Sequence, residues 1–113
     1  MILSLDIGTS SVKAGLFDMR GRLLDRRGNN VPFLPNAGYE IDPAEWISAI
    51  EKLVPSMLAG RKERLRSVVI SGNGPTLVAV GSRGEVLYPA VLWLDQRGAA
   101  ETSQRLELSL IHI

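Results

Sequence analysis

The sequence of 113 residues contains no cysteine and a single histidine, His112, which is the penultimate residue. The absence of thiols excludes a disulfide framework and a thiolate metal site. A lone histidine at this position gives poor support for a zinc site or for histidine-based catalysis. Disulfide-stapled folds, zinc proteins and enzymes that use a catalytic histidine are therefore the first classes set aside.

The chain also lacks a strong excess of charge and a long apolar run. Its formal net charge is +1, and the local basic cluster within residues 61–66 is typical of a solvated loop after a helix. No apolar run approaches the roughly 20 residues that span a bilayer. Residues 1–6 lack the basic start and long apolar stretch of a signal peptide. We therefore expect a cytoplasmic protein that binds neither nucleic acid nor membranes.

The remaining composition, 45% hydrophobic and 22% charged, is that of a globular chain with one modest core. Strand-like segments at residues 2–6, 12–17 and 22–27 are separated by turn-forming residues. They predict a three-stranded antiparallel meander over residues 2–29. Residues 29–38 are rich in Pro, Asn and Gly and predict a loop.

A helix is predicted to follow Asp42, which is a good N-cap, with Pro43 in the first helical position and Glu45 completing a capping-box-like pattern. Pro55 removes a backbone hydrogen bond and is expected to end or bend this helix early. One apolar stripe at helical spacing is formed by Trp46, Ile47, Ile50, Leu53, Val54, Met57 and Leu58. Capping and packing explain Asp42, Glu45 and Trp46, so we do not count them as site residues.

The C-terminal half predicts a second group of elements. They are a core strand at 67–71, a turn at 72–75, a hairpin with arms at 77–80 and 85–87, a strand or extended piece at 90–94, and a helix at 95–108.

Polar residues interrupt the first two predicted strands. Asp6 ends the first strand, Gly8 follows, and three hydroxyl residues and a cation come next: Thr9, Ser10, Ser11 and Lys13. Burial of such a group is costly unless a ligand satisfies it, and a polyphosphate with its metal would do so. In this interpretation the glycine permits a tight turn, amides and hydroxyls donate to phosphate, the lysine neutralises charge and the aspartate holds Mg²⁺. The alternative is a plain hairpin with a solvated lysine.

Residues 5–13 resemble the first phosphate motif of the actin-like ATPase superfamily, in the D-x-G-T-[ST]-x-x-[KR] form of FGGY carbohydrate kinases. Residues 38–46 are similar to the G-x-x-E-x-D-P-x-x-W segment of that family, and residues 89–97 to its P-A-I-x-W-x-D-x-R segment. Residues 69–75 fall where members carry I-S-G-Q or I-T-N-Q. The four stretches occur in family order and cover the chain to about residue 106.

The resemblance implies an α/β fold of the ribonuclease H-like, actin-like ATPase type, with an antiparallel β-meander plus helices in an incomplete first lobe. It implies a longer parent that transfers the ATP γ-phosphoryl group to a sugar or polyol hydroxyl and uses ATP and Mg²⁺. The implied phosphate-binding residues are Gly8, Thr9, Ser10, Ser11 and Lys13, with Asp6 for the metal. A homodimer of the parent is left open.

The resemblance also implies which residues line the carbohydrate-binding site. The implied substrate-binding residues are Asn73, Gly74, Pro75, Thr76, Asp95 and Arg97. The Gln-Met-His sequence of xylulokinase-like members is replaced here, so the family's imidazole contact is missing and xylulose is placed in doubt. Asp95 and Arg97 could bind hydroxyls or each other. Trp93 could stack on a sugar, although core packing is the preferred interpretation.

The catalytic aspartate of the family is expected beyond residue 113, so no catalytic residue is assigned, and the isolated chain is expected to have no kinase activity. We expect residues 1–107 to form a partial kinase N-terminal domain and residues 108–113 to be an atypical tail, foreign or truncated. Two alternatives remain at this point. One is a non-kinase nucleotide module of the actin or chaperone type, and the other is a binding protein without nucleotide.

Overall fold

The computed structural model describes residues 1–35 and 38–99. Its first three strands are β1 (Ile2–Ile7), β2 (Ser11–Phe17) and β3 (Leu23–Asn30). They pair antiparallel in chain order, which confirms the predicted meander. The Asp18 carboxylate closes the second turn because it accepts hydrogen bonds from the backbone N–H groups of Arg20 and Arg22.

The strand β5 (Ser67–Gly72) joins the other side of β1 and runs parallel to it. The sheet order is therefore β3-β2-β1-β5. Because parallel strands end at the same edge of a sheet, the loops that follow β1 and β5 are neighbours. The Asn73 N–H donates to the Ile7 carbonyl oxygen at 3.0 Å, which ties the start of one loop to the other strand.

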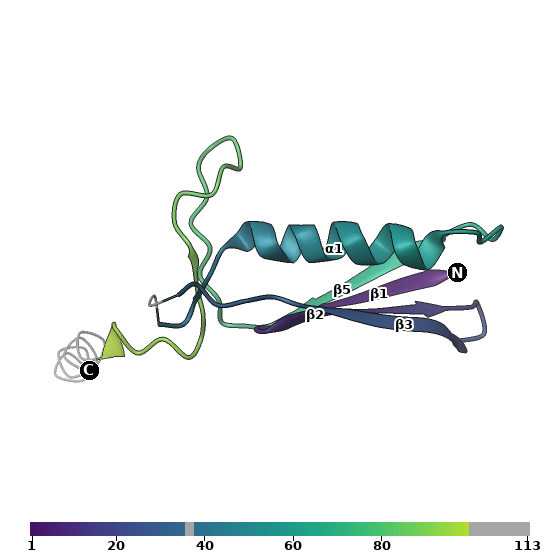
Figure 1. Ribbon diagram of the computed structural model, residues 1–113, viewed down its shortest axis with the longest axis horizontal. Coiled ribbons are helices and arrows are strands. Elements are labelled where there is room, and N and C mark those ends of the chain that lie inside the picture. Colours follow the sequence, from purple (N-terminus) through teal and green to yellow (C-terminus); the bar gives the residue numbers. More distant parts are fainter. Residues whose placement is uncertain (36–37, 100–113) are drawn as a thin grey trace, which may run out of the picture.

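Helix α1 (Pro43–Leu58) connects the meander to β5 and lies along one face of the sheet (Figure 1). The Asp42 side chain caps it by accepting from the Ala44 N–H, as its position predicts. The helix runs through Pro55 to Leu58, so of the two expected outcomes, an early end or a bend, the early end is wrong. The buried side chains of Leu53 and Met57, on either side of Pro55, anchor the last turn against the sheet.

The core lies between α1 and the meander. Alternate residues of β1 and β2 face the helix and are buried, while the residues between them face the other side of the sheet. The buried residues of the core are Met1, Leu3, Leu5, Val12, Ala14, Leu16, Val31, Ile41, Trp46, Ala49, Leu53, Met57, Ala90 and Leu92. The face of β1 and β2 opposite α1 is left open by the described residues, and it carries Ser4, Asp6 and Lys13 together with Phe17.

The strand β5 forms where it was predicted, but its description as a core strand is wrong. All six of its residues are exposed among the described residues, and Ile70 exposes 63% of its surface. The physical reason is its place at the edge of the sheet, since α1 packs over β2 and β3 rather than over β5.

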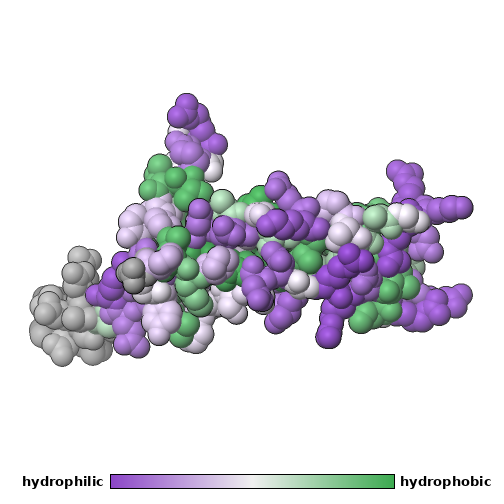
Figure 2. Space-filling view, viewed as in Figure 1, coloured by the Kyte–Doolittle hydropathy of each residue, from purple (hydrophilic) through white to green (hydrophobic). Residues whose placement is uncertain are grey.

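A second, two-stranded sheet pairs β4 (Glu40–Ile41) antiparallel with β6 (Ala90–Val91). Between β5 and β6, residues 77–89 project as an arm that is polar at its tip and apolar below it (Figures 1 and 2). The arm is a hairpin held by the Gly81 N–H to Glu85 O and Leu87 N–H to Ala79 O hydrogen bonds. Its two sides also meet in an isolated antiparallel bridge between Val80 and Val86. The predicted hairpin is therefore present, although neither side is long enough to form a strand.

The predicted strand at 90–94 is limited to β6. Of the predicted helix at 95–108, residues 95–98 are not helical, Ala99 is, and residues 100–108 lie outside the described residues. The proposed boundary at residue 107, between the partial kinase domain and the C-terminal tail, also lies outside the described residues. Within the described part of the chain, no helix has the length and apolarity to cross a membrane.

Candidate functional site

The loop between β1 and β2 is a tight turn that requires glycine. The Gly8 N–H donates to the Ser11 carbonyl oxygen at 2.9 Å. A Cβ atom added to Gly8 would lie 2.9 Å from that same oxygen, closer than real Cβ contacts. A side chain at this position would therefore force the turn open, so the predicted role of Gly8 in a close backbone turn fits the geometry.

Three other segments hold this turn from outside. The indole Nε1–H of Trp46, on α1, donates to the Gly8 carbonyl oxygen at 3.2 Å. The Val31 N–H, just after β3, donates to the Ser10 carbonyl oxygen at 2.9 Å. From the loop after β5, the Asn73 Nδ2 donates to Thr9 Oγ1 at 2.7 Å. The carbonyl oxygens of Gly8 and Ser10 are thus satisfied by protein donors.

The central backbone N–H donors of the same turn have no acceptor within the described residues. Among residues 1–35 and 38–99, neither the Thr9 N–H nor the Ser10 N–H donates to a protein acceptor. The Lys13 ammonium and the Asp6 carboxylate likewise have no hydrogen-bond or ion-pair partner in that part of the chain. Unpaired amide donors beside a free cation are the features that an anion-binding turn requires.

Asp6 and Lys13 lie directly opposite each other in the β1–β2 register, on the open face of the sheet. A shallow cavity of about 190 Å³ on this face is lined in part by Ser4, Asp6, Lys13 and Arg26. Arg26 was not predicted as a site residue. Only the β2–β3 register, which pairs Gly15 with Arg26, brings its side chain to the face that carries Lys13.

The loop after β5 contains four of the predicted substrate residues. The Asn73 side chain is engaged at both ends, since its amide donates to Thr9 and its Oδ1 accepts from Thr76 Oγ1 at 3.1 Å. Gly74 and Pro75 lie exposed between them. The structure therefore places Asn73 in contact with the β1–β2 turn and Thr76 in contact with Asn73.

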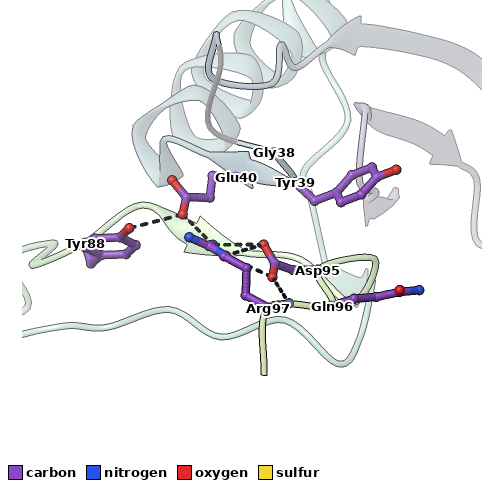
Figure 3. A pocket seen from close by; sticks show the side chains of 7 residues that line it. All are labelled: Gly38, Tyr39, Glu40, Tyr88, Asp95, Gln96 and Arg97. Carbon is purple, nitrogen blue, oxygen red and sulfur yellow. Dashed lines mark hydrogen bonds and ion pairs between the residues drawn. The ribbon is translucent and has the colours of Figure 1, made fainter. Parts of the chain in front are cut away.

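The other two predicted substrate residues lie in a separate cluster (Figure 3). The Arg97 guanidinium contacts Asp95 Oδ2 at 2.8 Å and Glu40 Oε1 at 2.5 Å, and the Tyr88 hydroxyl donates to the same Glu40 oxygen at 3.2 Å. These residues line a cavity of about 630 Å³ together with Gly38, Tyr39 and Gln96. Within the described residues, the side-chain bonds of Asp95 and Arg97 run to this cluster and not to the β1–β2 turn.

The cluster contains two ion pairs that share Arg97, and it joins the β4–β6 sheet to the chain that follows it. The Glu40 and Asp95 side chains are only 6% and 8% exposed, whereas Arg97 reaches solvent. Hydrogen bonds from the Arg97 side chain, and then from its backbone N–H, hold the pKa of Asp95 below its usual value. The same carboxylate, followed by Glu40, raises the pKa of Arg97, which therefore stays charged.

Three features of the site differ from the expectations. Trp93 is 55% exposed, so its predicted core packing is wrong, because the chain turns outward directly after the buried Leu92. Trp46 was set aside as a packing residue, yet its indole also supports the phosphate-motif turn. Glu40 was unassigned, although its place in a segment already singled out by its resemblance was the available signal.

These elements define the class of the protein: the first part of an actin-like α/β lobe, with a meander, a crossover helix and a parallel fourth strand. The sequence profile described as "FGGY family of carbohydrate kinases, N-terminal domain" matches residues 1–111. The chain belongs to this family.

The individual relatives agree with that assignment. The chain is 31% identical to a xylulose kinase of Lactococcus lactis over 99% of its own length and 24% of that protein. It is 30% identical to a glycerol kinase of Acidovorax ebreus over 94% of the chain and 22% of that protein. A gluconate kinase structure from Lactobacillus acidophilus superimposes with a TM-score of 0.87 at 19% identity, covering 94% of this chain and 22% of that one. The chain thus spans about a quarter of the length of these relatives, and the expected actin-like fold is confirmed.

Proposed function

We propose that the protein to which this chain belongs transfers the γ-phosphoryl group of ATP to a hydroxyl group of a sugar or polyol. The observation that carries this proposal is the β1–β2 turn, whose carbonyl oxygens are bound by protein donors while, within the described residues, its amides and nearby cation are free. Family membership supports the same reaction, since the matched relatives are named as kinases of xylulose and glycerol.

In this proposal the phosphate groups of ATP lie against the turn. The N–H groups of Thr9 and Ser10 donate to phosphate oxygens, the hydroxyls of Thr9, Ser10 and Ser11 add further donors, and the Lys13 ammonium offsets the charge that develops during transfer. Gly8 allows the phosphate to approach the backbone closely. Phosphoryl transfer depends mostly on positioning and charge stabilisation, and both are functions that this turn can supply.

Asp6 fits the role of a magnesium ligand. Its carboxylate lies at the end of β1 on the open face, opposite Lys13, and has no protein partner within the described residues. Mg²⁺ is commonly bound through one or two carboxylates together with substrate phosphates and water. No group of three or more His, Cys, Asp or Glu side chains gathers in the described part of the chain, which suits that mode rather than an all-protein cage. The metal would supply charge neutralisation at the phosphate oxygens.

The carbohydrate is proposed to lie beside the loop of Asn73, Gly74, Pro75 and Thr76, which adjoins the turn through the Asn73–Thr9 hydrogen bond. Asp95 and Arg97 are proposed to contribute from the second cavity, where the exposed part of the guanidinium can donate to hydroxyl groups. The histidine that xylulokinase-like members carry at this loop is replaced by proline, so a ketose or polyol other than xylulose is the favoured acceptor class.

The reaction forms a bond between the acceptor oxygen and the γ-phosphorus and breaks the bond from that phosphorus to the bridging oxygen, releasing ADP. The hydroxyl proton passes to a carboxylate base. No carboxylate of this chain is assigned to that role, and the base is expected beyond residue 113. The location is proposed to be cytoplasmic, with a homodimer of the longer protein as its proposed assembly.

The test compares Lys13→Ala with Lys52→Ala in the longest product of the reading frame that contains this chain. Lys52 is an exposed helix residue, so its loss controls for charge alone. Loss of a cation that contacts phosphate should weaken MgATP binding about tenfold or more and lower sugar-dependent ADP release, because hydrogen bonds to charged groups contribute about 1.5–3 kcal/mol. The Lys52 variant should match the wild type.

Three outcomes distinguish the alternatives. ATP hydrolysis that no sugar or polyol stimulates would favour a non-kinase nucleotide module. Unchanged affinity and turnover in Lys13→Ala would favour a protein whose glycine turn binds no nucleotide. The 113-residue chain alone is expected to release no ADP with any sugar, and detectable release would contradict the assignment of the base to a later segment.

A further inference from the structure

The Asn73 side chain connects the two loops of the candidate site through hydrogen bonds at both of its ends. Its Nδ2 donates to Thr9 Oγ1 at 2.7 Å, and its Oδ1 accepts from Thr76 Oγ1 at 3.1 Å. All three side chains are half-buried. The first bond joins residues 64 positions apart in the chain.

The two hydrogen bonds form a row that runs from Thr76 through Asn73 to Thr9, and each is donated in that direction. The Thr76 hydroxyl gives its only proton to Asn73, which orients the amide so that its NH₂ group points at Thr9. An amide donor then fills an acceptor position of the Thr9 oxygen. The single O–H of Thr9 is therefore left to donate elsewhere, beside the N–H groups of Thr9 and Ser10, which are free within the described residues.

We propose that Asn73 is a positioning residue that sets the Thr9 hydroxyl as a donor to an anion in the β1–β2 turn, with Thr76 holding Asn73 in that orientation. The inference rests on the proposed phosphate site and deepens it. It assigns Asn73 a task on the nucleotide side, through Thr9, instead of the direct carbohydrate contact that its loop suggests. The ligand class is a phosphate ester or anhydride, and the probe is MgATP.

The contacts of Asn73 fix its orientation toward the nucleotide side of the site. One of its two amide protons and one lone pair of its carbonyl oxygen are engaged within the protein, and the amide proton is directed at the phosphate-binding residue Thr9. The contacts are partly shielded from water, so they hold the amide more firmly than exposed contacts would.

The experiment is a double-mutant cycle in the longest product of the reading frame, with MgATP affinity and the KM values for ATP and sugar as readouts. Asn73→Ala should weaken MgATP binding about tenfold with little change in the sugar KM. In a Thr9→Val background the same change should cost less than about twofold, because its target hydroxyl is gone. A Thr9→Ser background, which keeps the hydroxyl, should restore the dependence on Asn73.

Ser82→Ala, which removes an exposed polar side chain at the tip of the arm, far from either cavity of the candidate site in the sequence, is the control and should bind MgATP like the wild type. If Asn73→Ala does not fold, Thr76→Val, which keeps the shape of the threonine, enters the same cycle. An equal loss in the wild-type and Thr9→Val backgrounds, or a rise in the sugar KM alone, would overturn the inference and leave the kinase proposal standing. Failure of the wild-type protein to bind MgATP would overturn both.

Discussion

At the scale of single residues, the shape of the β1–β2 turn depends on side chains that lie far away in the sequence. Trp46 is an example, since its ring is buried in the core while its Nε1–H reaches the Gly8 carbonyl oxygen at 3.2 Å. A buried tryptophan usually needs such a partner. Here the partner is the backbone of the turn itself, so a packing residue also shapes the site.

Trp46→Phe removes this donor while keeping an aromatic ring in the core. We expect a loss of about 1 kcal/mol in the free energy of unfolding, typical of one hydrogen bond, with a further contribution from the smaller ring. Thermal or denaturant unfolding measures the first effect. Amide chemical shifts at Gly8 and Thr9 report the change in the turn.

The matched control is Trp93→Phe, which changes an exposed tryptophan outside the core. It should leave both the stability and the turn resonances as they are in the wild type. Unchanged Gly8 and Thr9 resonances in Trp46→Phe would show that the indole packs without shaping the turn.

At the scale of elements, two short strands are held by two ion pairs that share Arg97. The β4–β6 sheet is only two residues long on each side, and it is joined to the following chain by the contacts of Arg97 with Glu40 and Asp95. Burial of both carboxylates would be costly without this guanidinium. The cluster therefore stabilises the short sheet and positions the segment that leads toward residue 99.

The pKa of Asp95 is lowered by Arg97, and this fixes the sign of a pH dependence. A carboxyl with a lowered folded-state pKa contributes stability above its unfolded-state pKa, and this contribution is lost as the pH falls through the folded-state value. We expect the Asp95 carboxyl carbon to titrate below the usual aspartate range in an NMR experiment. Arg97→Ala should move that titration upward.

Asp18 is the internal control for this titration. Its pKa is also lowered, chiefly by the hydrogen bond from the Arg22 backbone, at a turn remote from the cluster in the sequence. Its midpoint should stay the same in Arg97→Ala. A shift of Asp18 together with Asp95 would indicate a general change of fold, and an unmoved Asp95 would contradict the role of Arg97.

At the scale of the whole molecule, the described residues leave an exposed apolar edge. Val68, Val69 and Ile70 are exposed in succession on β5, and this strand contains no charged residue and no proline. An edge strand of this kind is a template for pairing with another chain. In the matched relatives the corresponding region belongs to much longer proteins, of which this chain matches 24% and 22%, so additional segments are available to cover it.

The 113-residue chain by itself is therefore expected to self-associate through β5 as its concentration rises. Val69→Lys places a charge on this exposed strand and should reduce the association at least severalfold, as measured by sedimentation. Ser82→Lys adds the same charge at the tip of the arm and should have no such effect. Equal reduction by both variants would point to net charge rather than to the strand edge.

The meander, the capped helix and the strand at β5 could be predicted because each depends on neighbours a few residues apart. The errors have a common cause. The helix continues past Pro55 because buried side chains on either side of it pack against the sheet. The strand β5 is an exposed edge because α1 packs over β2 and β3. Trp93 is exposed because the chain turns outward after Leu92. Each depended on packing between elements, which local patterns do not contain.

For the candidate site, the sequence alone determined which groups are present: a glycine turn, hydroxyls, a carboxylate and a cation in one short stretch, in the order of a known family. Only the tertiary structure decided which of them remain free to bind a ligand. Trp46, Arg97 and Asn73 reach partners 38, 57 and 64 positions away, respectively. Hydrogen bonds over such separations arise from the register of the sheet and the packing of the helix, and so they exist only once the chain has folded.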